Sequence, residues 1–141
     1  ANVEMQWAPN VWWTGSLSKD PAPWWPGPPY VQSLCLDGYN DSTDPDWTFT
    51  EIFGGSYDKL VALAPGKPIW IGETGIDANK ITATGRQKWI TDMYRVIATD
   101  RFKAIAAVVY FDRVGEGRHW TLDTEGQAAL KATGGVMPEY P

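Results

Sequence analysis

The chain has 141 residues, which is enough for one domain with a hydrophobic core. Its net charge of -5, its pI of about 4.7 and the lack of a basic cluster argue against nucleic acids and anionic membranes as partners. The single cysteine, Cys35, excludes an internal disulfide, and its apolar neighbours favour a buried, inert thiol. No apolar run approaches the ~20 residues of a membrane span.

The first predicted element is a strand over residues 2–7, where apolar and polar side chains alternate. It begins almost at once, without an initiator Met or a visible signal peptide. We therefore expect the middle of a longer chain, a processed product or a shortened piece. The nine Trp, six Tyr and four Phe indicate either a large core or a surface on which sugars stack.

Residues 11–30 form a long loop, because five prolines and two glycines exclude regular structure there. Loops of this length in small domains are usually functional or disordered, and an aromatic-rich loop is seldom disordered. Its four tryptophans either pack the loop down or line a groove, and the sequence leaves both possibilities open. They are Trp12, Trp13, Trp24 and Trp25.

A second strand is predicted over residues 31–36, followed by a polar set, Asp37-Gly38-Tyr39-Asn40, at its carboxyl end. Residues 41–46 form a turn-rich loop, and Thr48 with Glu51 has the spacing of a capping box. A short helix should end near Gly54-Gly55, and residues 56–63 continue helical until Pro65-Gly66 breaks the helix.

The stretch Lys67-Pro68-Ile69-Trp70-Ile71-Gly72-Glu73-Thr74-Gly75 predicts a buried strand that carries a carboxylate at its end. Its apolar run without alternation is typical of a parallel strand covered on both faces. Gly72 allows close approach of another group, and Thr74-Gly75 should end the strand. Barrels and open parallel sheets place their chemistry at such carboxyl ends, although Glu73 could also be only a solvated strand-end residue.

A capping box at Thr84 and Gln87 opens the next helix, and residues 104–111 form a fourth, apolar strand. A last helix starts at Thr124 and should stop near Gly134-Gly135. Alternating buried strands and amphipathic helices predict an α/β fold with a parallel sheet. Four such units are half of a (β/α)8 TIM-type barrel, so residues 1–141 are predicted to be one half-barrel whose open edges pair with something.

The motifs together resemble strands five to eight of the family 26 glycoside hydrolases, the β-mannanase family, over nearly the whole chain. The motifs are Asn2-Val3 with Trp7-Ala8-Pro9-Asn10, Trp25-Pro26-Gly27 with Tyr30-Val31, Leu36-Asp37-Gly38-Tyr39-Asn40, Lys67-Pro68-Ile69 to Glu73-Thr74-Gly75, and Val108-Val109-Tyr110-Phe111-Asp112. The family usually has Trp in place of Tyr110.

The resemblance implies that Glu73 is the catalytic nucleophile and that Tyr39 hydrogen-bonds its carboxylate. It also implies that Tyr110 belongs to the sugar platform. The family's general acid/base is a Glu after a His on strand four. It has no counterpart here, because the first strand of this chain is expected to match the family's strand five. The predicted substrate-binding residues are Asn10, Trp12, Trp13, Trp24, Trp25, Asp37, Tyr110 and Asp112.

A retaining glycosidase needs two carboxyl groups ~5–5.5 Å apart, and Asp37 and Asp112 are the candidates in this chain for the second one. Each also fits a structural role: Asp37 in a turn, and Asp112 as a strand-end cap or a partner of Arg113. The only histidine, His119, is interpreted as a loop residue rather than a base or ligand. No His/Cys cluster indicates a metal, and no glycine loop indicates a phosphate cofactor.

Two functions follow from these patterns. The first is a retaining, β-mannanase-like glycoside hydrolase acting on a β-linked polysaccharide, extracellular, and dependent on a separate N-terminal barrel half or a self-dimer. The second is a non-catalytic carbohydrate-binding or assembly fragment with a Trp-rich platform.

Overall fold

Four parallel strands form the main sheet in the order β1-β2-β3-β4, which is also their order in the chain. The computed structural model describes residues 3–11, 20–42, 47–115 and 117–133. It confirms the predicted α/β class and the parallel pairing. The strands are β1 (Gln6–Trp7), β2 (Ser33–Asn40), β3 (Ile69–Ile76) and β4 (Ile105–Tyr110), and the α-helices are α1 (Phe49–Leu63), α2 (Ala83–Ile97) and α3 (Thr124–Ala132).

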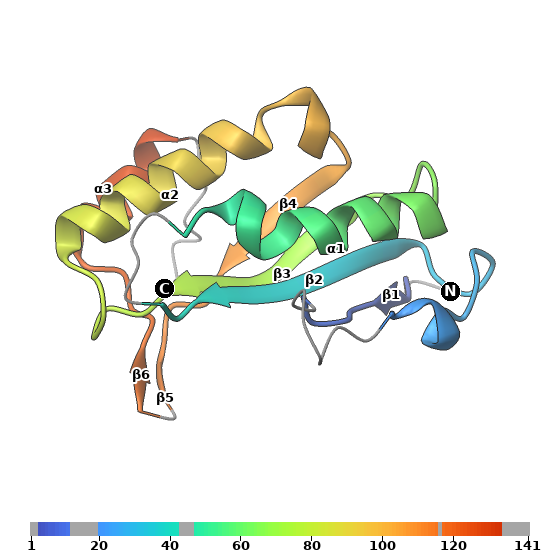
Figure 1. Cartoon of the computed structure of the whole chain (residues 1–141), viewed down its shortest axis with the longest axis horizontal. Coiled ribbons are helices and arrows are strands. Elements are labelled where there is room, and N and C mark those ends of the chain that lie inside the picture. Colours follow the sequence, from blue (N-terminus) through green and yellow to red (C-terminus); the bar gives the residue numbers. More distant parts are fainter. Residues whose placement is uncertain (1–2, 12–19, 43–46, 116, 134–141) are drawn as a thin grey trace.

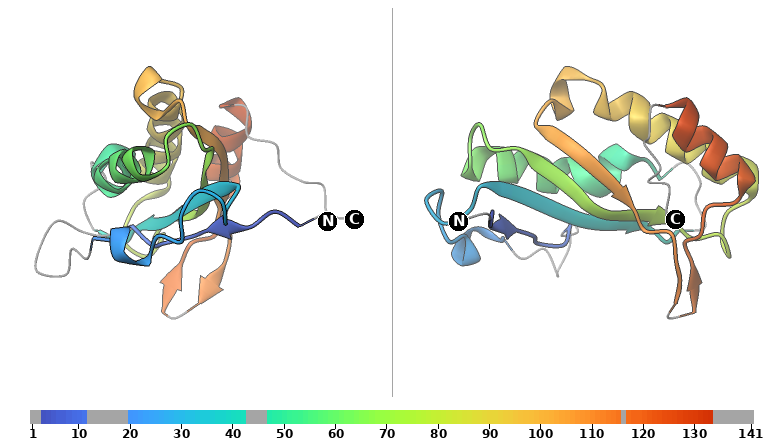
Figure 2. Two further views of the ribbon diagram at one scale, coloured as in Figure 1. Left: turned by 90° about the vertical axis from the view of Figure 1, so that its right-hand side faces the viewer. Right: turned by 180° about the vertical axis from the view of Figure 1, so that it is seen from behind.

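The three α-helices lie on one side of the sheet, as Figures 1 and 2 show. A short antiparallel hairpin, β5 (Val114–Gly115) and β6 (Arg118–His119), extends past the opposite side. Two 3-10 turns complete the described elements, η1 (Ala22–Trp24) and η2 (Asp100–Phe102). We call the sheet surface away from the helices the open face; it carries Cys35, Asp37, Tyr39, Trp70 and Glu73.

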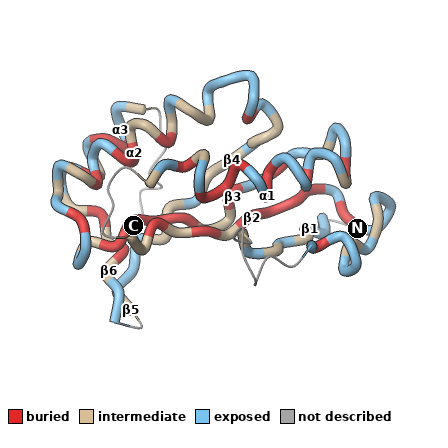
Figure 3. Tube along the Cα trace, viewed as in Figure 1, coloured by how far each residue is buried: buried red, intermediate tan, exposed pale blue. Residues whose placement is uncertain are grey.

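The hydrophobic core lies between the sheet and the helices. Alternate side chains of β2 and β3 point into it and are fully buried, because successive strand residues face opposite sides. The strand residues are Leu34, Leu36, Ile69, Ile71 and Ile76, and they meet Phe49, Phe53, Leu60, Ile90 and Met93 of the helices. Figure 3 shows the same concentration of burial along β2 and β3. Burying each such side chain stabilises the fold by ~1.5–3 kcal/mol.

Helix starts follow the predicted capping chemistry, with two corrections of position. Thr48 and Glu51 form the expected capping box, and the Glu51 carboxylate accepts the Thr48 backbone N–H at 2.7 Å. Helix α1 then continues through Gly54-Gly55 instead of ending there. A Cβ added at Gly54 would lie 2.9 Å from Arg101 Nη2. Helix α2 begins two residues before the expected box, and its cap is Thr82, which accepts the Gly85 N–H at 3.2 Å.

Strand bounds also differ from expectation. Only Gln6–Trp7 of the expected 2–7 strand pairs as β1 among the described residues. Strands β2 and β3 extend through the polar residues that were expected to end them, reaching Asn40 and Ile76. The continuous parallel ladder from Gly38↔Thr74 to Asn40↔Ile76 holds these residues extended despite their turn-like chemistry.

The described part of the long loop packs one tryptophan and exposes another. The Trp25 ring lies 5.0 Å from the Trp7 ring between centroids, so this residue holds the loop against the sheet edge. Trp24 is 63% exposed. Trp12 and Trp13 lie outside the described residues, as do the Gly134-Gly135 expected to end α3. Among the described helices, none is long and apolar enough to cross a membrane.

Candidate active site

A β-bulge at Gly72 decides which way Glu73 points. Strand β2 pairs Leu36 with Ile71 and then Asp37 with Glu73, so its ladder skips Gly72. Strand β4 also skips one residue of β3 in the same place, between its pairings with Ile71 and Thr74. Without the extra residue, Glu73 would share the helix-facing side of Ile69 and Ile71. The bulge reverses the alternation and places Glu73 on the open face.

Only glycine fits at the bulge. A Cβ added to Gly72 would lie 2.3 Å from Cys35 Sγ and 2.8 Å from Asp37 Oδ1. Two side chains of β2 therefore cross directly over the Gly72 backbone. The prediction that Gly72 permits a close approach is confirmed, and the approaching groups are the neighbours of Glu73 on the open face.

Tyr39 and Glu73 are joined by a short hydrogen bond, in which the Tyr39 hydroxyl donates to Glu73 Oε2. Burial raises the pKa of Tyr39, and the hydrogen bond to Glu73 raises it further, so the hydroxyl keeps its proton and acts as a donor. The Tyr39 ring is held by Trp120, with 4.7 Å between centroids, and by the edge of Phe111, at 5.8 Å. A rigid phenol therefore fixes one oxygen of the Glu73 carboxylate.

Asp37 stands beside Glu73 on the neighbouring strand. Burial raises the pKa of Asp37, and the nearby charge of Glu73 adds to the rise. The Cys35 thiol lies 3.8 Å from Asp37 Oδ1 as a weak donor, and burial raises the pKa of that thiol to about 11. Cys35 is thus buried and protonated, in agreement with the inert thiol expected from the sequence.

Glu73 and Tyr39 line a cavity of about 420 Å³ on the open face, near the carboxyl ends of the strands. Asn10 reaches the same cavity, because it forms a parallel bridge with Asp37 and the next residue, Val11, donates its N–H to the Asp37 carbonyl at 2.8 Å. Three residues of the predicted site thus come together. The remaining lining residues are Phe111, Arg113, Gly115, Arg118 and Trp120.

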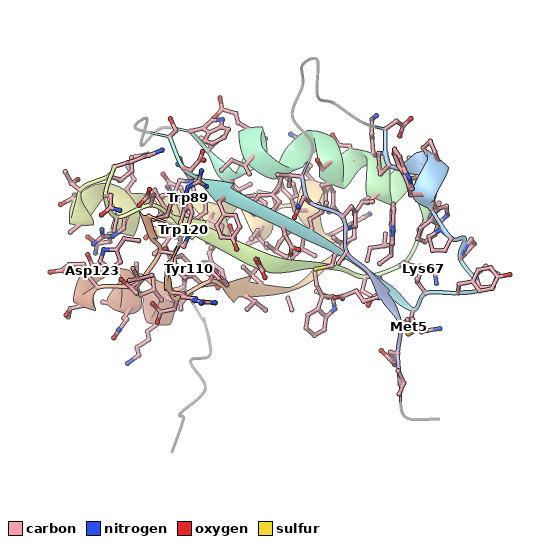
Figure 4. All side chains as sticks on the ribbon, turned by 90° about the horizontal axis from the view of Figure 1, so that it is seen from below. Met5, Lys67, Trp89, Tyr110, Trp120 and Asp123 are labelled. Carbon is pink, nitrogen blue, oxygen red and sulfur yellow. The ribbon has the colours of Figure 1, made fainter. Side chains whose placement is uncertain are left out.

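Tyr110 is not brought to this cavity, contrary to the expected convergence at one mouth. It pairs with Thr74 and packs against the core, and its hydroxyl accepts the Ile76 N–H at 3.3 Å. Burial raises its pKa to about 12. Phe111, one residue later, faces the cavity instead, because neighbouring residues point to opposite sides. Figure 4 views the sheet from the open side, with Tyr110 and Trp120 near one end and Met5 and Lys67 near the other.

The remaining predicted residues lie apart from the cavity lining. Asp112 is exposed, and its carboxylate accepts the Leu122 N–H at 2.8 Å, which is the structural capping role. Trp24 and Trp25 do not line the cavity. His119 lies in β6, and its backbone N–H donates to Asp77 Oδ1 at 3.1 Å. Its ring is hydrogen-bonded to the Thr121 hydroxyl. No group of three metal-ligating side chains occurs among the described residues.

Sequence reasoning missed the hairpin residues that complete the lining. Residues 113–120 were assigned only to the end of a strand and a surface loop. The signal that could have found them is Gly115-Glu116-Gly117, a turn sequence between two short segments, with Gly117 at a φ of 75°. The hairpin folds back so that Arg113, Arg118 and Trp120 line the cavity that Glu73 also lines.

Comparison with known proteins gives two matches. The chain is 30% identical over 109 residues to endoglucanase H of Acetivibrio thermocellus. The aligned region covers 74% of this chain and 11% of that protein. Its fold resembles the crystal structure of a GH128 (subgroup II) endo-β-1,3-glucanase from Sorangium cellulosum, with a TM-score of 0.53 and 17% identity. That likeness covers 88% of this chain and 53% of the glucanase. No family model matches the chain.

These matches establish an α/β fold with a four-stranded parallel sheet like that of a glycoside hydrolase, and a sequence similarity to an endoglucanase. The chain spans about half the length of the glucanase structure and a small part of endoglucanase H.

Proposed function

We propose that this chain is part of a retaining glycoside hydrolase that acts on a β-linked polysaccharide, with Glu73 as the nucleophile. The observation that carries the proposal is the Tyr39–Glu73 hydrogen bond inside a cavity at the carboxyl ends of parallel strands. The bond holds one carboxylate oxygen of a residue that lines the cavity. The names of the two similar proteins support polysaccharide hydrolysis.

In the proposed reaction, a Glu73 oxygen attacks the anomeric carbon of the sugar while the bond to the leaving oxygen breaks. A separate acid protonates that oxygen, and water later hydrolyses the glycosyl ester on Glu73. The Tyr39 hydroxyl keeps the carboxylate aligned for attack. Asn10 and Phe111 line the same cavity and are the proposed sugar contacts.

The proton donor comes from outside the described residues in this proposal. Asp37 does not line the cavity, because Cys35 and the Gly72 backbone lie against its carboxylate. Asp112 does not line it either and is bonded to Leu122. We therefore propose that the acid/base belongs to a barrel half that supplies the first four strands. General acid catalysis contributes ~10²–10⁴-fold, so the chain alone should hydrolyse polysaccharide very slowly.

The open face supports the need for such a half. On the open face, Trp70 and Val109 are 41% and 48% exposed. Covering their apolar surface would gain ~25 cal/mol per Å². The chain also spans only 53% of the glucanase that it resembles. Gel filtration tests this: we expect a complex with the missing half, or else a dimer of this chain, and a monodisperse, cooperatively folding monomer would contradict it.

Activity after complementation tests the function. The chain is mixed with a half that carries the acid/base, and hydrolysis of β-mannan and β-glucan is compared. The resemblance to β-mannanases favours the first substrate, and the names of the similar proteins favour the second.

Glu73→Gln should abolish the gained activity, whereas Glu125→Gln, which changes an exposed carboxylate on α3, should retain it. Gained activity that survives Glu73→Gln would refute the proposed nucleophile. Oligosaccharide binding without any gained activity would favour the non-catalytic alternative, for which the exposed Trp24 is the supporting observation.

A further inference from the structure

One face of the β5–β6 hairpin lines the cavity that Glu73 also lines. Gly115 pairs with Arg118, and Trp120 donates its N–H to the Arg113 carbonyl at 2.9 Å. Residues two apart on a strand share a face, so these four residues lie on one side of the hairpin. All four line the cavity that contains Glu73. The hairpin therefore presents two guanidinium groups to the same space as the proposed nucleophile.

The two arginines differ in what balances their charge. Arg118 is paired with Asp41 at 3.0 Å, and its Cζ lies 5.7 Å from the Trp120 ring centroid. Among the described residues, no ion pair joins Arg113 to Glu73 or to any other carboxylate. Its Nε passes 3.8 Å from where a Cβ on Gly115 would lie, so the glycine leaves room beside the guanidinium. Arg113 is thus an exposed, uncompensated cation at the edge of the cavity.

We propose that Arg113 binds the carboxylate of a uronic acid unit in the polysaccharide, so that a β-linked glycan with acidic units is preferred over a neutral one. This inference rests on the proposed function, since it places a sugar in the cavity beside Glu73. The planar guanidinium can offer two parallel N–H groups to a carboxylate, a geometry that a neutral hydroxyl does not match.

The negative charge of the chain and of its cavity supports the proposal that Arg113 meets a carboxylate. The chain carries a net charge of -5, and Glu73 adds a negative group inside the cavity itself. An acidic glycan would be repelled there unless a cation met its carboxylate locally. Arg118 is already paired with Asp41, so among the described lining residues Arg113 is the arginine without a carboxylate partner. A neutral glycan would need no such group.

The test compares the binding of matched oligosaccharides to the 141-residue chain by titration calorimetry at low salt. The first probe is a β-linked oligosaccharide that contains uronic acid, and the second is the same oligosaccharide with its carboxyl groups reduced to hydroxymethyl groups. The third is an oligosaccharide of equal length that carries sulfate esters in place of the carboxylates. We expect the uronate probe to bind about tenfold more tightly than its reduced form, the factor typical of one charge-assisted pair.

Arg113→Gln should bring that ratio close to one, and Arg113→Lys should give an intermediate ratio because it keeps the charge but loses the planar fork. Arg95→Gln is the matched control, since it removes one positive charge from an exposed site on α2. It should leave the ratio unchanged. The preference should also fall in concentrated salt.

Equal affinity for the uronate and reduced probes, or a preference that survives Arg113→Gln, would overturn the inference. An equal or larger gain with the sulfated probe would overturn the assignment to a carboxylate. If the reduced probe binds and a glycosyl group can be trapped on Glu73 while the ratio is one, only this inference fails. If no oligosaccharide binds and no glycosyl group can be trapped on Glu73, the proposed function fails with it.

Discussion

The two faces of one sheet differ sharply although they are built from the same two strands. On the helix side, Ile69 and Ile71 are fully buried among apolar side chains. On the open face, Trp70 between them is 41% exposed, and three residues further on Glu73 meets Tyr39 across the strands. The residues that stabilise the fold are therefore concentrated on one side of β3, whereas the candidate catalytic residue lies on the other. Gly72 connects the two, because its bulge sets the side on which Glu73 emerges.

The largest expected effect comes from cutting into the buried face. Ile71→Ala removes a fully buried side chain and should lower the free energy of unfolding by ~2–5 kcal/mol. Trp70→Ala, at the adjacent position on the open face, should cost clearly less despite its larger side chain, when both variants are compared at protein concentrations too low for a dimer. Urea denaturation of both variants measures the contrast. Equal losses would mean that the open face is buried in solution, as it would be in a dimer.

The next effect comes from the bulge. Gly72→Ala adds a methyl group that must displace Cys35 Sγ and Asp37 Oδ1, and overpacking of this kind costs ~1–3 kcal/mol. Combining it with Cys35→Ala should recover part of the loss, because the closest contact is removed. Gly55→Ala is the control, since no atom lies within 4 Å of a Cβ there and the helix should gain ~0.5–1 kcal/mol. Thermal unfolding measures all four proteins. A harmless Gly72→Ala would show that the crossing over the bulge is loose.

The smallest effect is a pH dependence centred on Asp37. Burial, and then the charge of Glu73, raise its folded-state pKa above the ordinary value of 3.8. The folded protein therefore binds the proton more tightly than the unfolded chain, and this carboxyl favours folding less as pH rises above that value. Asp37→Asn removes the titration. The gap in the free energy of unfolding between the variant and the native chain should therefore widen in favour of the variant from acidic to neutral pH. Urea unfolding across that range measures this gap. A gap that narrows toward neutral pH would contradict the sign.

The sequence was sufficient for the parallel βα order, because that order depends on local patterns of buried strands and amphipathic helices. The hydrogen bond between Tyr39 and Glu73 was expected only from the resemblance to the family 26 glycoside hydrolases. The sequence was not sufficient for the direction of side chains beyond Gly72, since the bulge exists only through pairing with strands on both sides. That Phe111 lines the cavity and Tyr110 does not has a related origin, because a shift of one residue along a strand moves a side chain to the opposite face of the sheet. Arg113 and Trp120 reach the site through the folding of a hairpin and have no motif of their own.

The central claim is that Glu73, held by Tyr39 on the open face, attacks a sugar. Its most direct test is the intact mass of the chain after incubation with an activated aryl β-glycoside, whose leaving group needs little protonation. We predict a mass gain of one glycosyl unit, located on Glu73 by peptide mapping. The gain should be absent in Glu73→Gln, reduced in Tyr39→Phe and unchanged in Glu125→Gln. A glycosyl group carried by another residue, or one that persists in Glu73→Gln, would contradict the account.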